Sequence, residues 1–193
     1  GLFGTSRGVV TFQPALDFPD RLPSGHFSLA LNDPFTALGW RHGLALFFLL
    51  IWLHVLVWDP VAREQRRLFL PPELDQMSFF NAAVLRPTRG HFQVALIAFA
   101  GMTRFSACLY SSETGIWGNI NSLELESYIL PLEGASTLIG NSFCWLLTGR
   151  YRHVILEFDL DTQSLAVTEL PPHIEPGFHK LWIMPAEGGV FGF

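Results

Sequence analysis

The sequence predicts an all-β fold made of repeated antiparallel units, and three observations lead to that prediction. A strand–turn–strand pattern recurs with a period of roughly 50 residues. The chain contains 13 prolines and 17 glycines, and no long stretch keeps the 3.6-residue apolar period of a helix. Hydrophobic residues make up 49% of the 193 residues and charged residues only 15%, so there is ample apolar material for a buried core.

The repeat is clearest in two segments, residues 56–72 and 156–172. Each holds an apolar strand that ends in an aromatic residue and Asp, then a polar turn, a second strand and Leu-Pro-Pro. The aromatic residues are Trp58 and Phe158, and a divergent copy between them has Tyr110; the three positions lie 52 and 48 residues apart. This period is typical of kelch-type blades, so the sequence predicts a partial β-propeller of about three to four blades.

Each part of the repeat has a physical role. The Asp after the aromatic residue is expected to accept hydrogen bonds from turn amides, and proline ends the second strand because it lacks a donor. Continuous apolar runs at residues 43–47, 92–99 and 137–147 predict strands buried on both faces. Residues 72–83 and 123–130 could hold a turn of helix, which the predicted fold does not need.

One apolar run, residues 44–58, has the hydropathy of a membrane segment. It holds 15 residues with a single His, whereas a spanning helix needs about 20. It is rich in β-branched and aromatic residues, and its end matches the strand that recurs later. The sequence therefore predicts buried strands here and no membrane partner. No signal peptide is expected, because no basic leader precedes the run.

Charge and cysteine usage narrow the class of protein. The net charge is −5 and the Lys and Arg residues are scattered, so no basic stripe indicates a nucleic acid or an anionic membrane as partner. Cys108 and Cys144 are too few for a disulfide framework, and each lies in an apolar run where a free thiol is a small buried hydrophobe. These features favour an intracellular location, cytoplasmic or nuclear.

Several motifs, in order along the chain, resemble a known family. They are Arg41-His-Gly-Leu-Ala-Leu46, Val57-Trp-Asp-Pro60, Leu70-Pro-Pro72, Cys108-Leu-Tyr-Ser-Ser-Glu-Thr-Gly-Ile-Trp-Gly118, Gly140-Asn-Ser-Phe-Cys-Trp-Leu146 and Ile155-Leu-Glu-Phe-Asp159. Together they resemble the C-terminal F-box-associated region of plant F-box proteins, in the branch found in grasses. The resemblance covers residues 35–193, an incomplete propeller-like repeat region, and residues 1–34 form an N-terminal strand and linker segment.

The resemblance implies a kelch-like propeller that captures a protein substrate for a Skp-cullin-F-box ubiquitin ligase. Such a domain is a receptor without a catalytic site, and it reaches a Skp-type adaptor only through an F-box, which this chain does not contain. Residues 70–74 imitate the opening of an F-box, but no amphipathic helix pattern follows them. Family members usually carry a polar turn where this chain has the apolar residues 48–51.

Other sequence features suggest chemistry, but each has a simpler explanation. Gly4–Gly8 matches a nucleophile elbow around Ser6, yet a strand follows it and no strand is visible before it. Residues 159–161 resemble a calcium loop but lack its later Gly and Glu, so a hairpin turn is expected. His173 and His179 flank a loop without an obvious third metal ligand. We therefore expect no catalytic residue, metal or cofactor.

The remaining candidates are residues that would contact a partner. Most aromatic residues of the repeats are expected in the blade cores: Trp58, Tyr110, Trp117, Trp145, Phe158 and Trp182. Arg104, Arg150 and Arg152 are expected at loop tips, where arginine is a favoured interface residue, and are the predicted partner-binding residues. Two alternatives stay open: an interaction module or degenerate fragment with no ligase role, and an enzymatic propeller, for which no gathering of carboxylates is visible.

Overall fold

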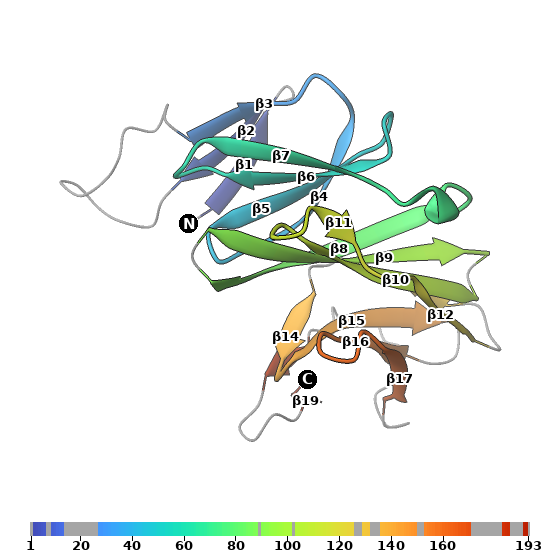
Figure 1. The fold of residues 1–193 in the computed structure, drawn as a ribbon. Coiled ribbons are helices and arrows are strands. Elements are labelled where there is room, and N and C mark those ends of the chain that lie inside the picture. Colours follow the sequence, from blue (N-terminus) through green and yellow to red (C-terminus); the bar gives the residue numbers. More distant parts are fainter. Residues whose placement is uncertain are drawn as a thin grey trace. The chain divides into compact units, whose positions relative to one another are not determined.

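The computed structural model is all-β, as predicted (Figure 1). It describes residues 2–6, 9–13, 27–88, 90–101, 103–125, 129–131, 136–149, 153–170, 183–185 and 191–192. Within these ranges helical conformation is confined to Phe27 and to a single 3-10 turn, η2 (Pro72–Leu74). The chain divides into two compact units, Gly1–Leu70 and Pro71–Phe193, and each is described by itself.

The first unit contains two antiparallel sheets. A three-stranded sheet has the order β1 (Leu2–Ser6), β2 (Val9–Gln13), β3 (Ser28–Ala30). A four-stranded sheet has the order β4 (Phe35–Arg41), β5 (Leu44–Leu49), β6 (His54–Asp59), β7 (Glu64–Phe69). Because neighbours in the sheet are also neighbours in the sequence, the second sheet is a simple meander of the kind that forms a propeller blade.

The core of the first unit lies between these sheets. Val10 and Leu29 from the three-stranded sheet pack in one cluster with Phe47, Leu56 and Trp58 from the four-stranded sheet. All six residues of β5 are buried, which is why its sequence lacks the alternation of a half-exposed strand. The apolar run 44–58 is thus two strands and their turn, as predicted. In the described residues no helix is long and apolar enough to cross a membrane.

The second unit contains two larger antiparallel sheets. One is built from β8 (Phe79–Thr88), β9 (His91–Ala100) and β10 (Arg104–Ser111), with β11 (Ile116–Trp117) and β12 (Asn121–Glu124) both pairing with β10. The other is built from β15 (Ser142–Gly149), β16 (His153–Asp159) and β17 (Leu165–Glu169), with β13 (Ile129–Pro131) and β14 (Thr137–Ile139) both pairing with β15. A short pair, β18 (Met184–Pro185) and β19 (Phe191–Gly192), completes the described elements.

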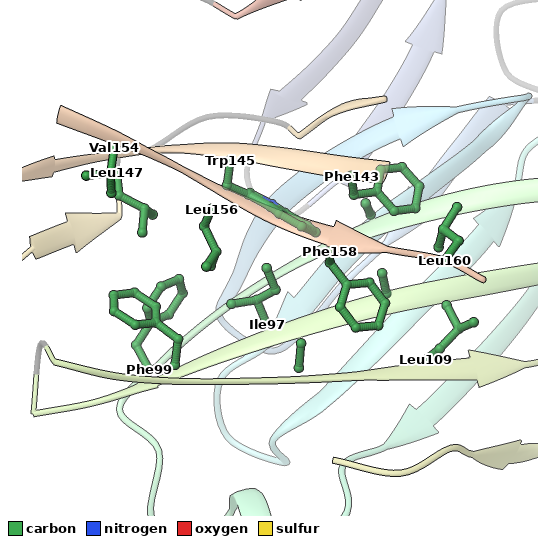
Figure 2. Packing of buried hydrophobic residues seen from close by; sticks show 14 residues of the cluster. Ile97, Phe99, Leu109, Phe143, Trp145, Leu147, Val154, Leu156, Phe158 and Leu160 are labelled. Carbon is green, nitrogen blue, oxygen red and sulfur yellow. The ribbon is translucent and has the colours of Figure 1, made fainter. Parts of the chain in front are cut away.

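The two large sheets pack face to face. Figure 2 shows side chains of β15 and β16 pointing toward those of β9 and β10, with Phe143, Leu156 and Phe158 opposite Ile97 and Phe99. All five are at most 4% exposed, so the interface is a dry core. Two stacked five-stranded antiparallel sheets are the arrangement that neighbouring blades require, and the predicted all-β fold of antiparallel sheets is confirmed.

The predicted turn chemistry is also observed. Asp59 ends β6, and its Oδ1 accepts hydrogen bonds from the amides of Val61 and Ala62, both at 3.0 Å. Asp159 ends β16, and its Oδ1 accepts from the amides of Asp161 at 3.1 Å and Thr162 at 2.7 Å. Residues 159–161 are therefore a hairpin turn, as expected from the repeat.

The divergent copy uses the same turn with a different side chain. Ser111 ends β10, and its Oγ accepts a hydrogen bond from the amide of Glu113 at 3.3 Å. Four residues after each of the three strand ends, the chain adopts a left-handed conformation, with φ of 59° at Arg63, 77° at Gly115 and 54° at Gln163. The repeat inferred from sequence is thus a repeat in backbone conformation as well.

One sequence expectation needs correction and another is confirmed. A strand does precede Ser6, because β1 pairs with β2 and places Ser6 opposite Val9. Since strand β2 and no helix follows, the nucleophile-elbow geometry is absent all the same. The helical turn expected within residues 72–83 is present as η2, and β8 begins at Phe79.

Candidate functional site

A surface groove of about 570 Å³ lies in the second unit. Two parts of the chain line it: residues 71–77, which include η2, and the edge of the sheet formed by β10, β11 and β12. Its volume falls within the range of roughly 300–1,000 Å³ that is typical of ligand sites. The groove is therefore the candidate binding site in the described part of the second unit.

The apolar part of the groove comes from both segments. Leu74 is buried at 1% exposure, and Met77, Trp117 and Ile120 are half-buried. Trp117 lies on β11 opposite Tyr110, and their ring centroids are 5.3 Å apart in an edge-to-face arrangement. A partly exposed indole that is fixed from one side in this way is a rigid anchor for an apolar ligand group.

Besides Ser106 and Ser122, the polar lining of the groove includes the exposed side chains of four larger residues, Glu73, Gln76, Arg104 and Asn119. The side chains of these four larger residues make no hydrogen bond or ion pair with another residue in the described ranges. Their hydrogen-bonding capacity is directed to solvent or to a ligand. A carboxylate, a guanidinium and two amides at one apolar groove can bind a peptide through both its backbone and its side chains.

The backbone around the groove is held by specific contacts. Ser106 and Ser122 face each other across β10 and β12, with their hydroxyl oxygens 2.8 Å apart. The amide of Gly118 donates to the carbonyl of Leu109 at 2.8 Å. A Cβ at Gly118 would lie 2.9 Å from Oε1 of Gln163, the end of a flexible side chain, and 3.3 Å from the backbone carbonyl oxygen of Leu109. These contacts fix the loop that carries Asn119.

The same loop is tied to the neighbouring sheet. The side-chain amide of Asn121 donates to the backbone carbonyl of Gln163 at 2.7 Å. This bond joins β12 to the left-handed residue of the third turn. The sheet that lines the groove is therefore fastened to the neighbouring sheet through β12, which limits the groove's rearrangement when a ligand binds.

Of the three predicted partner-binding arginines, Arg104 lines the groove. It is the first residue of β10, directly after the β9–β10 turn, and its side chain is exposed. Arg150 and Arg152 lie outside the described residues, as do Trp182, His173 and His179. Glu73, Gln76, Trp117 and Asn119 were not predicted as binding residues.

Most of the aromatic residues assigned to blade cores are there. Trp58, Tyr110, Trp145 and Phe158 are all at most 7% exposed. Trp117 differs, because it is half-buried and lines the groove. The position of Trp117 directly after the polar turn of the divergent repeat, on the outermost strand, was the available signal for an exposed aromatic residue.

The two cysteines behave as buried hydrophobes. Both are free and at most 1% exposed. Burial, assisted by the charge of Glu73, raises the pKa of Cys108 to about 12. Burial, assisted by Glu157, likewise raises the pKa of Cys144 to about 12. Neither thiol is a nucleophile at neutral pH in the folded chain.

A second exposed feature lies in the first unit, at the turn between β5 and β6. We call it the apolar tip; it consists of Leu50, Ile51, Trp52 and Leu53, whose side chains are 51%, 59%, 61% and 36% exposed. Leu53 has a left-handed φ of 44°. Of the apolar residues 48–51 that the sequence marked as unusual, Leu50 and Ile51 belong to this tip, whereas Phe48 and Leu49 are buried in β5.

Comparisons with known proteins assign no family. No protein-family model matches the chain, and no curated protein sequence matches it. Among the described residues there is no group of three or more His, Cys, Asp or Glu side chains that could hold a metal ion.

Proposed function

We propose that this chain is a non-catalytic protein-recognition module, the substrate-binding part of an F-box protein in a Skp-cullin-F-box ubiquitin ligase. The observation that carries the proposal is the groove between residues 71–77 and the β10–β12 edge. The resemblance of residues 35–193 to the F-box-associated region supplies the link to ubiquitin. The role implies an intracellular location, cytoplasmic or nuclear.

The physical support comes from the composition of the groove. Protein interfaces combine an aromatic or arginine anchor with an apolar centre and a polar rim. Here Trp117 and Arg104 are the anchors, Leu74 belongs to the apolar part, and Glu73 and Gln76 belong to the rim. A substrate receptor needs only such a surface, since the cysteine chemistry of ubiquitin transfer resides in other proteins of the ligase.

The ligase role is tested with the full-length product of the gene that encodes this chain. We expect that product to co-purify with a recombinant Skp-type adaptor, and the 193-residue chain alone not to do so, because the adaptor is bound by the F-box. Failure of the full-length protein to bind the adaptor would remove the ligase role.

If the full-length protein does not bind the adaptor, one alternative function is still compatible with the groove. The groove does not depend on a link to ubiquitin, so a full-length protein that binds a partner but no adaptor would be an interaction module of the same architecture. Titrating a purified partner against the chain and against its Trp117→Ala variant distinguishes this case. Weaker binding of the variant supports a module that acts through the groove.

A further inference from the structure

We infer that the groove binds an extended peptide segment in which a bulky apolar residue lies next to a carboxylate. The inference rests on the proposed function as a protein-recognition module, and it names the class of segment that the module takes. Two observations carry the inference: the identity of the side chains that line the groove, and the absence of partners for some of them among the described residues.

The apolar residue of the ligand would pack against the apolar side chains that line the groove. Leu74, Met77, Trp117 and Ile120 line it from two different segments of the chain. A single large aliphatic or aromatic side chain fits between such residues, and burying it against a fixed indole supplies most of the affinity of a short peptide. A wholly polar ligand would leave this apolar surface exposed to water.

The carboxylate is the complement of Arg104. Its guanidinium is exposed and has no hydrogen-bonded or ionic partner in the described part of the chain, although Glu124 stands opposite it in the β10–β12 register. A guanidinium matches a carboxylate in two parallel hydrogen bonds, which are stronger than neutral ones. Arg104 is the only Lys or Arg among the described residues that line the groove.

Glu73 would fix the orientation in which the peptide binds. Among the described lining residues it is the only acidic one, and it belongs to η2 whereas Arg104 belongs to β10. A ligand carboxylate is therefore attracted by one segment and repelled by the other. Gln76 and Asn119 carry amides that can pair with peptide N–H and C=O groups, which favours an extended backbone over a compact ligand.

The test is selection from a display library of random linear peptides against the 193-residue chain. We expect the selected peptides to share Asp or Glu next to Leu, Ile, Phe, Trp or Met. Against the Arg104→Glu variant, the same library should select Lys or Arg at the acidic position. A library that yields no binder, or binders without an acidic preference, would overturn the inference.

Affinity measurements on the best peptide sharpen the test. Arg104→Glu should weaken binding by about tenfold or more, and replacing the peptide's carboxylate by its amide should weaken it comparably. Arg63→Glu is the matched control, because it makes the same charge change on an exposed turn of the first unit, and it should leave the affinity within about twofold.

The two proposals fail separately. Suppose that the full-length protein binds the adaptor but the selected peptides show no acidic preference that depends on Arg104. That result would support the receptor role and reject this ligand class. Conversely, the acidic preference of the peptides could depend on Arg104 while the full-length protein binds no adaptor. That result would support the ligand class and reject the ligase role.

Discussion

Arg63, Gly115 and Gln163 occupy one conformational position, the fourth residue after a strand end, in three different hairpins. A left-handed φ brings Cβ toward the following carbonyl, which costs a non-glycine residue roughly 1–2 kcal/mol. Glycine avoids that cost, although it loses more backbone entropy on folding. Only the middle hairpin has the residue that this conformation favours.

Replacing Arg63 by glycine should therefore stabilise the chain. We expect Arg63→Gly to raise the free energy of unfolding by about 0.5–1 kcal/mol, and Gly115→Ala to lower it by about 1 kcal/mol. No atom lies within 4 Å of a Cβ placed at Gly115, so the effect there is one of backbone conformation alone. Urea denaturation at constant m-value measures both.

The matched control is Ala62→Gly, one residue earlier in the same turn. Ala62 is not among the residues with positive φ, so glycine there adds chain entropy to the unfolded state without relieving strain. We expect this variant to lose stability. If Arg63→Gly lost as much, the left-handed position would not be strained.

His54 is a second residue with an energetic cost. It begins β6, is 1% exposed, and neither imidazole nitrogen makes a hydrogen bond of good geometry. Burial lowers the pKa of His54 below its usual 6.5; Arg67 acts in the same direction, while the Trp52 backbone and Asp33 oppose it. The ring packs against Phe69 at a centroid distance of 5.4 Å.

This burial makes stability depend on pH. Because the pKa is lower in the folded state, the unfolded chain binds the proton more readily, and the free energy of unfolding falls as the pH drops below about 6.5. We expect His54→Leu to flatten the stability profile between about pH 7 and pH 5 and to be more stable than the parent at the acidic end. Urea melts at several pH values measure this. A parent chain whose stability rises toward pH 5 would contradict the assignment.

At the scale of elements, hairpins were well predicted and strand breaks were not. The Asp-capped turns after Trp58 and Phe158 followed from side-chain chemistry that acts within a few residues. The outer strand of the β8–β12 sheet is split into β11 and β12, and the Gly118-Asn119 pair in the gap is a local break signal that the prediction did not use. The bond from Asn121 to Gln163, which ties β12 to the neighbouring sheet, joins residues too distant in the sequence to be predicted.

The apolar tip is an element whose side chains contribute little to folding, because they are largely exposed. We expect Ile51→Lys and Trp52→Lys to change the free energy of unfolding by less than about 0.5 kcal/mol each. Val55, on the adjoining strand, is fully buried, and Val55→Lys should cost several kcal/mol by contrast. Chemical denaturation compares the three variants. A large loss at Ile51 would mean that the tip is covered in solution.

At the scale of the whole molecule, the repeat predicted the stacked antiparallel sheets but only part of the candidate site. Arg104 was found because arginine at a strand end favours contacts with partners. Glu73 and Asn119 were missed, since the segments that carry them come together only when η2 packs beside the β10–β12 edge. Hydrophobic period and turn residues carry no information about that juxtaposition.

Thiol reactivity reports on the integrity of the second unit. Cys108 and Cys144 lie on different sheets of that unit, and each has a pKa raised to about 12. We expect a disulfide reagent at pH 8 to modify neither thiol in the native chain and both on unfolding in urea. Equal rates for the two would show that the sheets open together. Rapid modification of one in native buffer would contradict its burial.

The apolar tip bears on how the folded chain is treated inside a cell. Quality-control chaperones recognise short runs of bulky apolar residues, which folding normally hides. Here Leu50–Leu53 stays accessible after the core has formed, because the strands on either side are buried while their connection is not. The native protein would therefore expose a segment of the kind that chaperones bind in unfolded chains. Its lifetime in the cell would depend on whether a partner covers that segment.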